Sequence, residues 1–221
     1  LPRKKDVDQV KKFMVVGGIY VRRDNFSVEE LVSHLIDQGI YPKLAGVTEW
    51  IYYMDWSQRF LLGDQLKRDG LVRAVLNGWL KDRAWLGLES WYKHRVDHQV
   101  KHALMPTGFL AEVFEDMDAA LEQGAREFVS PEMESEATIS PAVAAAAMQH
   151  GYHGVAIIAP FGCLPGRVIE GVYAPWAKQR GYPVVALEND GQPYPPNIIS
   201  RLEVFSHNVL RYEAPREGQE A

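Results

Sequence analysis

The chain has 221 residues, of which 47% are hydrophobic, so it can bury a full core as one large domain or two small ones. Its net charge of -5 argues against nucleic acid as a partner, and its single cysteine excludes both a disulfide framework and a metal site made only of its own thiolates. No apolar stretch reaches the roughly 18 residues of a membrane helix, and no signal leader is present. We therefore expect a cytoplasmic protein without a membrane partner.

The first part of the chain predicts a strand, a helix and a second strand. An apolar, β-branched run over Phe13 to Val21 predicts the first strand. Ser27 and Glu30 have the spacing of a capping box, and the helix that they predict ends at Gly39. Tyr41 to Val47 predicts the second strand.

Residues 57–104 differ in composition, with long and aromatic side chains at helical spacing. We expect two or three helices that form an insertion within one α/β domain covering residues 1–221. The chain opens with Leu1-Pro2-Arg3, which suggests a piece excised from a longer polypeptide.

The α/β pattern resumes after residue 108. We expect further helices and strands in the order helix Leu110–Gly124, strand Glu127–Val129, helix Pro141–His150, strand Val155–Ala159, a helix after Cys163, strand Pro183–Leu187 and helix Asn197–Leu210. The predicted fold is a three-layer α/β/α domain, Rossmann-like or flavodoxin-like, with four or five mostly parallel strands.

Cys163 directly follows a predicted buried strand and precedes a helix start. In a parallel sheet this junction lies at the carboxyl ends of the strands, where ligands bind, and helix amides there favour a thiolate. The alternative is a small buried hydrophobic residue, which free cysteine often is.

Arg22 and Arg23 follow the first predicted strand at the same edge of the sheet. A forked guanidinium group suits a phosphate or carboxylate, so Arg22 is a candidate site residue. An ion pair with Asp24 or Glu49 is the alternative.

Three glutamates, Glu132, Glu134 and Glu136, alternate along a segment that we expect to be extended. On one side of the chain their charges could raise a carboxyl pKa for proton transfer, whereas a solvated loop is the alternative. Glu136 is the candidate catalytic residue because it precedes an apolar helix at the same sheet edge as Cys163.

His94, His98 and His102 recur every fourth residue and would share one face of a helix. Both a metal site and a solvated stripe fit this spacing, and the charged neighbours Arg95 and Lys101 favour the stripe.

Several segments in order along nearly the whole chain carry a family resemblance: residues 16–22 (VGGIYVR), 49–51 (EWI), 160–165 (PFGCLP), 188–191 (ENDG), 194–197 (YPPN) and 201–205 (RLEVF). They resemble the 2-hydroxyacyl-CoA dehydratase family, and especially the dehydratase-like C-terminal region of CoA-substrate-specific enzyme activase-related proteins.

This resemblance implies an anaerobic radical system in which an ATP-dependent activator passes one electron to a component that holds a 4Fe-4S cluster. Three cysteines hold the cluster in that family; Cys163 matches the last, and the other ligands would lie upstream of Leu1. The chain departs from the family at Gly18, where many relatives carry an acidic residue. It contains no glycine-rich phosphate loop, so ATP would bind to another domain or protein.

We therefore expect a C-terminal dehydratase-like domain that contributes Cys163 to a 4Fe-4S cluster for low-potential electron transfer or acyl-CoA substrate activation. The alternative is a non-catalytic docking domain for the ATP-dependent activator module, without a cluster of its own. A third hypothesis is a thioester-binding module that uses Arg22 and the loop after Leu187. Whether the chain is an enzyme stays open, and we expect the fragment alone to be inactive.

Overall fold

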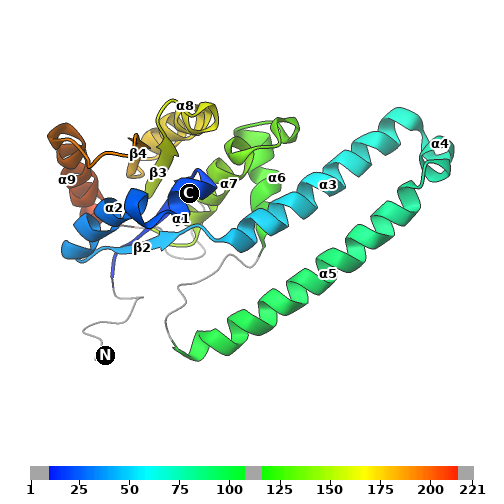
Figure 1. Cartoon of the computed structure of the whole chain (residues 1–221), viewed down its shortest axis with the longest axis horizontal. Helices are drawn as coiled ribbons and strands as arrows, with labels where there is room; N and C mark the ends of the chain where they lie inside the picture. The colour runs from blue at the N-terminus through cyan, green and yellow to red at the C-terminus, as the bar shows by residue number, and fades with distance from the viewer. Residues whose placement is uncertain (1–9, 108–115, 214–221) are drawn as a thin grey trace. The chain divides into compact units, whose positions relative to one another are not determined.

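The computed structural model describes residues 10–107 and 116–213 (Figure 1). The chain divides into two compact units. We call residues Leu1–Ala45 with Ala119–Ala221 the sheet unit, and Gly46–Asp118 the hairpin unit. The predicted insertion of residues 57–104 falls within the hairpin unit, whereas the start of the helix predicted over 110–124 lies outside the described residues.

The described part of the sheet unit contains four parallel strands in the order β2-β1-β3-β4. They are β1 (Lys12–Gly17), β2 (Tyr41–Leu44), β3 (Val155–Pro160) and β4 (Val184–Asn189). The chain winds from β1 outward to β2 and then returns to β3 on the other side of β1, so the strand order reverses between β1 and β3. This reversal makes the β1/β3 junction the topological switch point of a flavodoxin-like order.

Helices cover both faces of the sheet. Side chains of alternate strand residues, such as Phe13 and Ile158, pack with Leu31 of α2 (Asn25–Asp37) and Phe205 of α9 (Pro196–Arg211). Helices α7 (Glu136–Gln149) and α8 (Leu164–Gln179) pack on the strands and on each other, and successive strand side chains point to opposite faces, which places these two helices on the second face. The predicted three-layer α/β/α fold is confirmed.

The predicted first strand is wrong at its end. Strand β1 stops at Gly17, and residues Ile19–Arg23 form the short helix α1. Gly17 has a φ of +109°, and a β-carbon there would overlap with the main chain of Ile158, so only glycine fits where the chain leaves the strand. An apolar run does not reveal such a turn, because apolar residues serve both the strand and the short helix.

Two other boundaries differ from the sequence prediction. Asp24 caps α2, because its carboxylate accepts a hydrogen bond from the Ser27 amide at 3.0 Å, so the Ser27–Glu30 capping box is wrong. Strand β2 ends at Leu44, and α3 begins at Val47.

The predicted strand over Glu127–Val129 is also wrong. Helix α6 (Met117–Glu127) occupies its first residue and is followed by the 3-10 turn η3 (Pro131–Met133). The next helix, α7, starts at Glu136 rather than at Pro141, because the Ser135 hydroxyl caps it by accepting from the Ala137 amide. Pro141 therefore lies inside the helix that it was predicted to begin.

The hairpin unit is a helical hairpin, in which two long helices run in opposite directions and a short helix connects them (Figure 1). They are α3 (Val47–Asp69), α4 (Leu71–Leu76) and α5 (Trp79–Leu104), followed by the 3-10 turn η2 (Met105–Thr107). Helices α3 and α5 pack against each other along their length. Across the described residues, no helix combines the length and the apolar character needed to span a bilayer.

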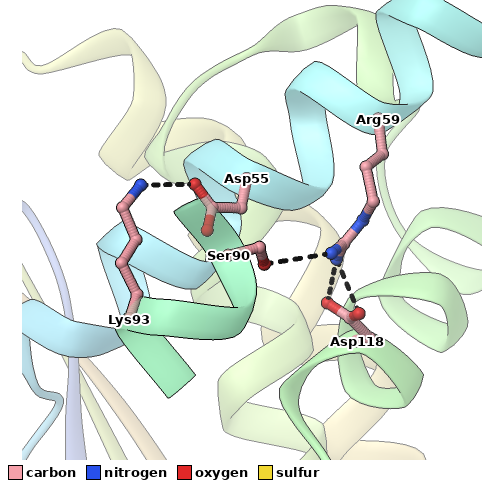
Figure 2. A network of polar contacts seen from close by, with 5 residues as sticks. All are labelled: Asp55, Arg59, Ser90, Lys93 and Asp118. Atoms are coloured by element: carbon pink, nitrogen blue, oxygen red, sulfur yellow. Dashed lines mark hydrogen bonds and ion pairs between the residues drawn. The ribbon is translucent and has the colours of Figure 1, made fainter. Parts of the chain in front are cut away.

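Polar side chains link α3 to α5, and to Asp118 at the start of α6, as Figure 2 shows. Asp55 is only 2% exposed, and its Oδ1 accepts from Lys93 Nζ at 2.7 Å. Arg59 donates to both carboxylate oxygens of Asp118 at 2.5 and 2.6 Å, and to Ser90 Oγ at 3.5 Å. The hairpin is thus held partly by ion pairs and hydrogen bonds across its inner face.

A half-buried histidine, His153, lies at the amino end of the sheet. The His153 ring accepts a hydrogen bond at Nδ1 from the Lys12 amide, at 3.2 Å. Burial, followed by the charge of Lys11, lowers the pKa of His153 from 6.5 to about 4. The folded protein therefore favours the neutral His153 ring. The stability that the neutral ring contributes is complete above about pH 6.5 and is lost as the pH falls toward about 4.

We expect His153→Gln to reduce the loss of stability of the sheet unit between pH 6.5 and 4. Urea unfolding followed by circular dichroism at several pH values measures this slope, and substitution of the exposed His207 by glutamine is the control. Equal pH dependence in the wild type and the His153 variant would contradict the assignment.

Candidate functional site

The ends of β1 and β3 lie against each other at the switch point. The Gly18 amide donates to the Ile158 carbonyl oxygen at 2.9 Å, and a side chain at Gly18 would lie 3.4 Å from Pro160 Cδ. We call this side of the sheet, with the turns that follow β1, β3 and β4, the carboxyl edge. Ligands of open α/β sheets bind at such an edge, next to the switch point.

Helix α7 holds the turn after β1. Glu136 Oε1 accepts from the Ile19 amide at 2.6 Å, and Ser140 Oγ accepts from the Gly17 amide at 3.2 Å. Glu136 therefore lies at the carboxyl edge, where the sequence placed it, and one of its oxygens fixes the main chain. A β-carbon at Gly18 would lie 3.8 Å from Glu136 Oε2.

The sequence analysis missed Ser140. Its signal was present, because Ser140 follows Glu136 by four residues and so lies on the same face of a helix that is otherwise apolar there. A polar residue at that spacing on a buried helix needs a hydrogen-bond partner, and the end of β1 supplies one.

The other two glutamates do not share a side with Glu136. Glu132 lies in η3, and Glu134 has the left-handed φ of 41°. The segment consists of the 3-10 turn η3 and the first residues of helix α7. The prediction of an extended chain with three aligned carboxylates is therefore wrong. Glu132 and Glu134 are exposed, as the loop alternative expected.

Arg22 lies in α1 and is 3% exposed. Its Nη1 donates to the Ala45 carbonyl oxygen at 3.0 Å, and Arg23 Nη2 donates to the same oxygen at 3.0 Å. The two guanidinium groups thus tie α1 to the chain just after β2. Arg22 is at the predicted edge, and its side chain contacts main chain there.

Cys163 is the N-cap residue of α8 and is half-buried. Within the described residues its side chain makes no capping hydrogen bond, while its amide donates to the Pro160 carbonyl oxygen at 3.1 Å. The thiol is therefore at the carboxyl edge, beside the switch point, and the fully buried alternative is wrong.

The turn that carries Cys163 is fixed to the end of β4. The Phe161 amide donates to the Asn189 carbonyl oxygen at 2.9 Å, and the Gly162 amide donates to Glu188 Oε1 at 3.2 Å. Glu188 also accepts from Arg167 Nη2 at 2.7 Å. A pocket of about 280 Å³ lies beside this cluster, lined in part by Phe161, Arg167 and Glu188.

The loop after β4 is ordered by its own side chains. Asn189 Oδ1 accepts from the Gly191 amide at 2.8 Å, and Glu30 Oε2 accepts from the Tyr194 amide at 2.8 Å. Burial and the Glu30 charge raise the pKa of Tyr194 to about 12, so its phenol stays neutral at ordinary pH. These bonds hold the loop after β4 in place at the carboxyl edge.

Three large apolar side chains at this edge are strongly exposed: Tyr20 by 77%, Phe161 by 73% and Leu164 by 71%. They are the most exposed large apolar residues of the sheet unit among those that the structure describes. Tyr20 follows β1, and the other two flank Cys163. We call these three residues the apolar rim.

The sequence analysis missed the apolar rim as well. Apolar residues next to strands predict burial, and all three belong to such runs. The one usable signal was the Pro160-Phe161-Gly162 turn, because a side chain in a tight surface turn has little core to enter.

The three histidines of α5 do not form a metal site. His94 stacks on Tyr52, with ring centroids 4.3 Å apart, and His98 stacks on His102 at 6.1 Å. No group of three metal-ligating side chains occurs within residues 10–107 and 116–213. The solvated-stripe alternative describes His98 and His102, which are exposed.

The fold and this edge define a flavodoxin-like α/β domain whose candidate binding edge lies at the β1/β3 switch point. Comparison of the chain with protein-family models, with curated proteins and with solved structures finds no match.

Proposed function

We propose that this chain is the dehydratase-like domain of a CoA-substrate-specific enzyme activase-related protein, and that its carboxyl edge docks a partner module. The apolar rim carries the proposal. Large apolar side chains gain about 1.5–3 kcal/mol each when buried, yet these three are strongly exposed at the carboxyl edge, and Phe161 and Leu164 flank the half-buried Cys163 in the sequence. The family resemblance names the ATP-dependent activator as the partner.

The turns at this edge suit a docking surface because they are held rigidly. Glu136 and Ser140 fix the turn after β1, while Glu188 fixes the turn after β3. A partner that covers the rim therefore meets a preformed surface and orders few additional groups, which lowers the entropic cost of binding.

The residues present do not fit a complete 4Fe-4S cluster. Such clusters are held mainly by cysteine thiolates, and the chain has one cysteine. The described residues also contain no other group of three side chains that could hold a metal. We therefore derive no electron-transfer or substrate-activation step through a cluster in this chain.

A second candidate function is the contribution of one ligand, Cys163, to a cluster whose other ligands come from outside this chain. Its support is the half-buried thiol at the amino end of α8, where helix amides favour a thiolate. Iron and acid-labile sulfide in the anaerobically purified parent polypeptide test it. Loss of iron in Cys163→Ser supports the contribution, and equal iron content in both proteins contradicts it.

The docking proposal predicts that Phe161→Asp with Leu164→Asp weakens binding of the purified activator domain at least about tenfold, equivalent to 1.4 kcal/mol. Both residues are exposed, so the fold should persist. Isothermal titration calorimetry measures the affinity, and Val204→Asp on the exposed side of α9 is the matched control. Unchanged affinity, or equal weakening by the control, would contradict docking through the rim.

A further inference from the structure

Helix α5 exposes an apolar stripe of five residues: Trp85, Leu88, Tyr92, Val96 and Val100. Their exposed fractions lie between 40% and 67%. Successive members are three or four residues apart, so they follow one face of the helix over four turns. No charged residue belongs to the stripe.

Another face of α5 packs against α3, and apart from the buried Leu86 its contacts there are made by polar side chains. Ser90 and Lys93 bond to Arg59 and Asp55 there, and Asp97 bonds to the Tyr52 hydroxyl. A helix on the surface of a globular protein normally buries its apolar face and exposes its polar face. Helix α5 has the reverse arrangement, which is the pattern of a helix that has another apolar surface to contact.

The exposed area is large enough for an interface. If a large side chain has roughly 150–250 Å² of surface, the stripe exposes on the order of 500 Å². That matches the largest apolar patch on a typical monomer, about 300–600 Å², which is often functional. Two such stripes, with the exposed Leu71, Val72 and Leu76 of α4, approach the roughly 1,200–2,000 Å² of a stable protein interface.

We propose that two copies of this chain dimerise by packing their α5 stripes against each other. The hairpin unit would then provide the dimer interface. A two-fold interface brings the same patch of each copy together, so the patch must be complementary to itself. An uncharged stripe does so without like-charge repulsion. Glu89 and Arg95 flank the stripe, so its borders carry both signs of charge.

This inference is independent of docking at the carboxyl edge, because it concerns residues of the hairpin unit alone. Sedimentation equilibrium of the full chain over a wide concentration range tests it. We expect a monomer–dimer equilibrium, and we expect Val96→Glu to raise the dimer dissociation constant at least about tenfold. Val204→Glu introduces the same charge at an exposed valine of the sheet unit and should leave the equilibrium unchanged.

Leu88→Lys is the second variant and should weaken the dimer similarly with the opposite charge. Circular dichroism verifies that each variant is folded. A wild-type chain that stays monomeric throughout, a dimer that both stripe variants leave intact, or equal weakening by Val204→Glu would overturn the proposal.

Discussion

Replacing Gly17 by alanine is expected to destabilise the sheet unit by more than about 4 kcal/mol, an exceptional effect for one methyl group. Gly17 combines a φ of +109° with close approach of its α-carbon to the Ile158 main chain. A β-carbon there would lie far closer to the Ile158 carbonyl oxygen than van der Waals contact allows. The β1/β3 pairing that creates the switch point would have to shift, and urea unfolding measures the cost.

Gly39→Ala is the matched control for this experiment. Gly39 also has a positive φ, of 80°, but no atom lies within 4 Å of a β-carbon built there. Its substitution should cost only the left-handed backbone strain, about 1–2 kcal/mol. If Gly17→Ala costs no more than Gly39→Ala, the close fit of Gly17 against Ile158 does not limit this position to glycine.

Replacing Lys93 by methionine is expected to destabilise the hairpin unit by about 3–5 kcal/mol, because it leaves the Asp55 carboxylate buried without its cation. Burial lowers the pKa of Lys93, but hydrogen bonds to Asp55 and Glu89 outweigh it and leave the pKa raised. Lys93 therefore keeps its charge at ordinary pH. Thermal and urea unfolding measure the effect of the substitution.

The double variant Asp55→Leu with Lys93→Met separates the ion pair from simple packing. Replacement of a buried ion pair by apolar residues of similar volume is often neutral or stabilising, so we expect the double variant to recover most of the lost stability. A cost below about 1 kcal/mol for Lys93→Met alone would show that the pair behaves as a solvated surface ion pair.

Periodicity predicted the layers of the sheet unit well. The strand before Cys163 and the strand over Pro183–Leu187 are short, apolar and bounded by turn residues, and both are present as β3 and β4. Gly39 follows α2 and has a positive φ of 80°, as we predicted for the glycine that ends this helix. Cys163 was also placed correctly, because a strand, a tight turn and a helix leave it few other positions.

Tertiary contacts decided what periodicity did not. The main chain of Ile158, a residue more than a hundred positions away, leaves no room for a side chain at Gly17, the last residue of β1. The apolar residues Phe161 and Leu164 have the pattern of buried positions, and only the three-dimensional arrangement leaves them exposed. Helix α5 has apolar residues on its outer face and polar residues on its inner face, so its spacing indicated a helix without indicating which face is buried.

Modification of Cys163 tests most directly whether a partner covers the carboxyl edge, as we propose. Because Cys163 is the only cysteine of the chain, the rate at which a maleimide reagent modifies it reports on this edge alone. We expect the purified activator domain to slow modification of Cys163 severalfold in the wild-type chain, and to give no protection when Phe161 and Leu164 are both replaced by aspartate. An unchanged modification rate for the wild-type chain at saturating activator would contradict the claim.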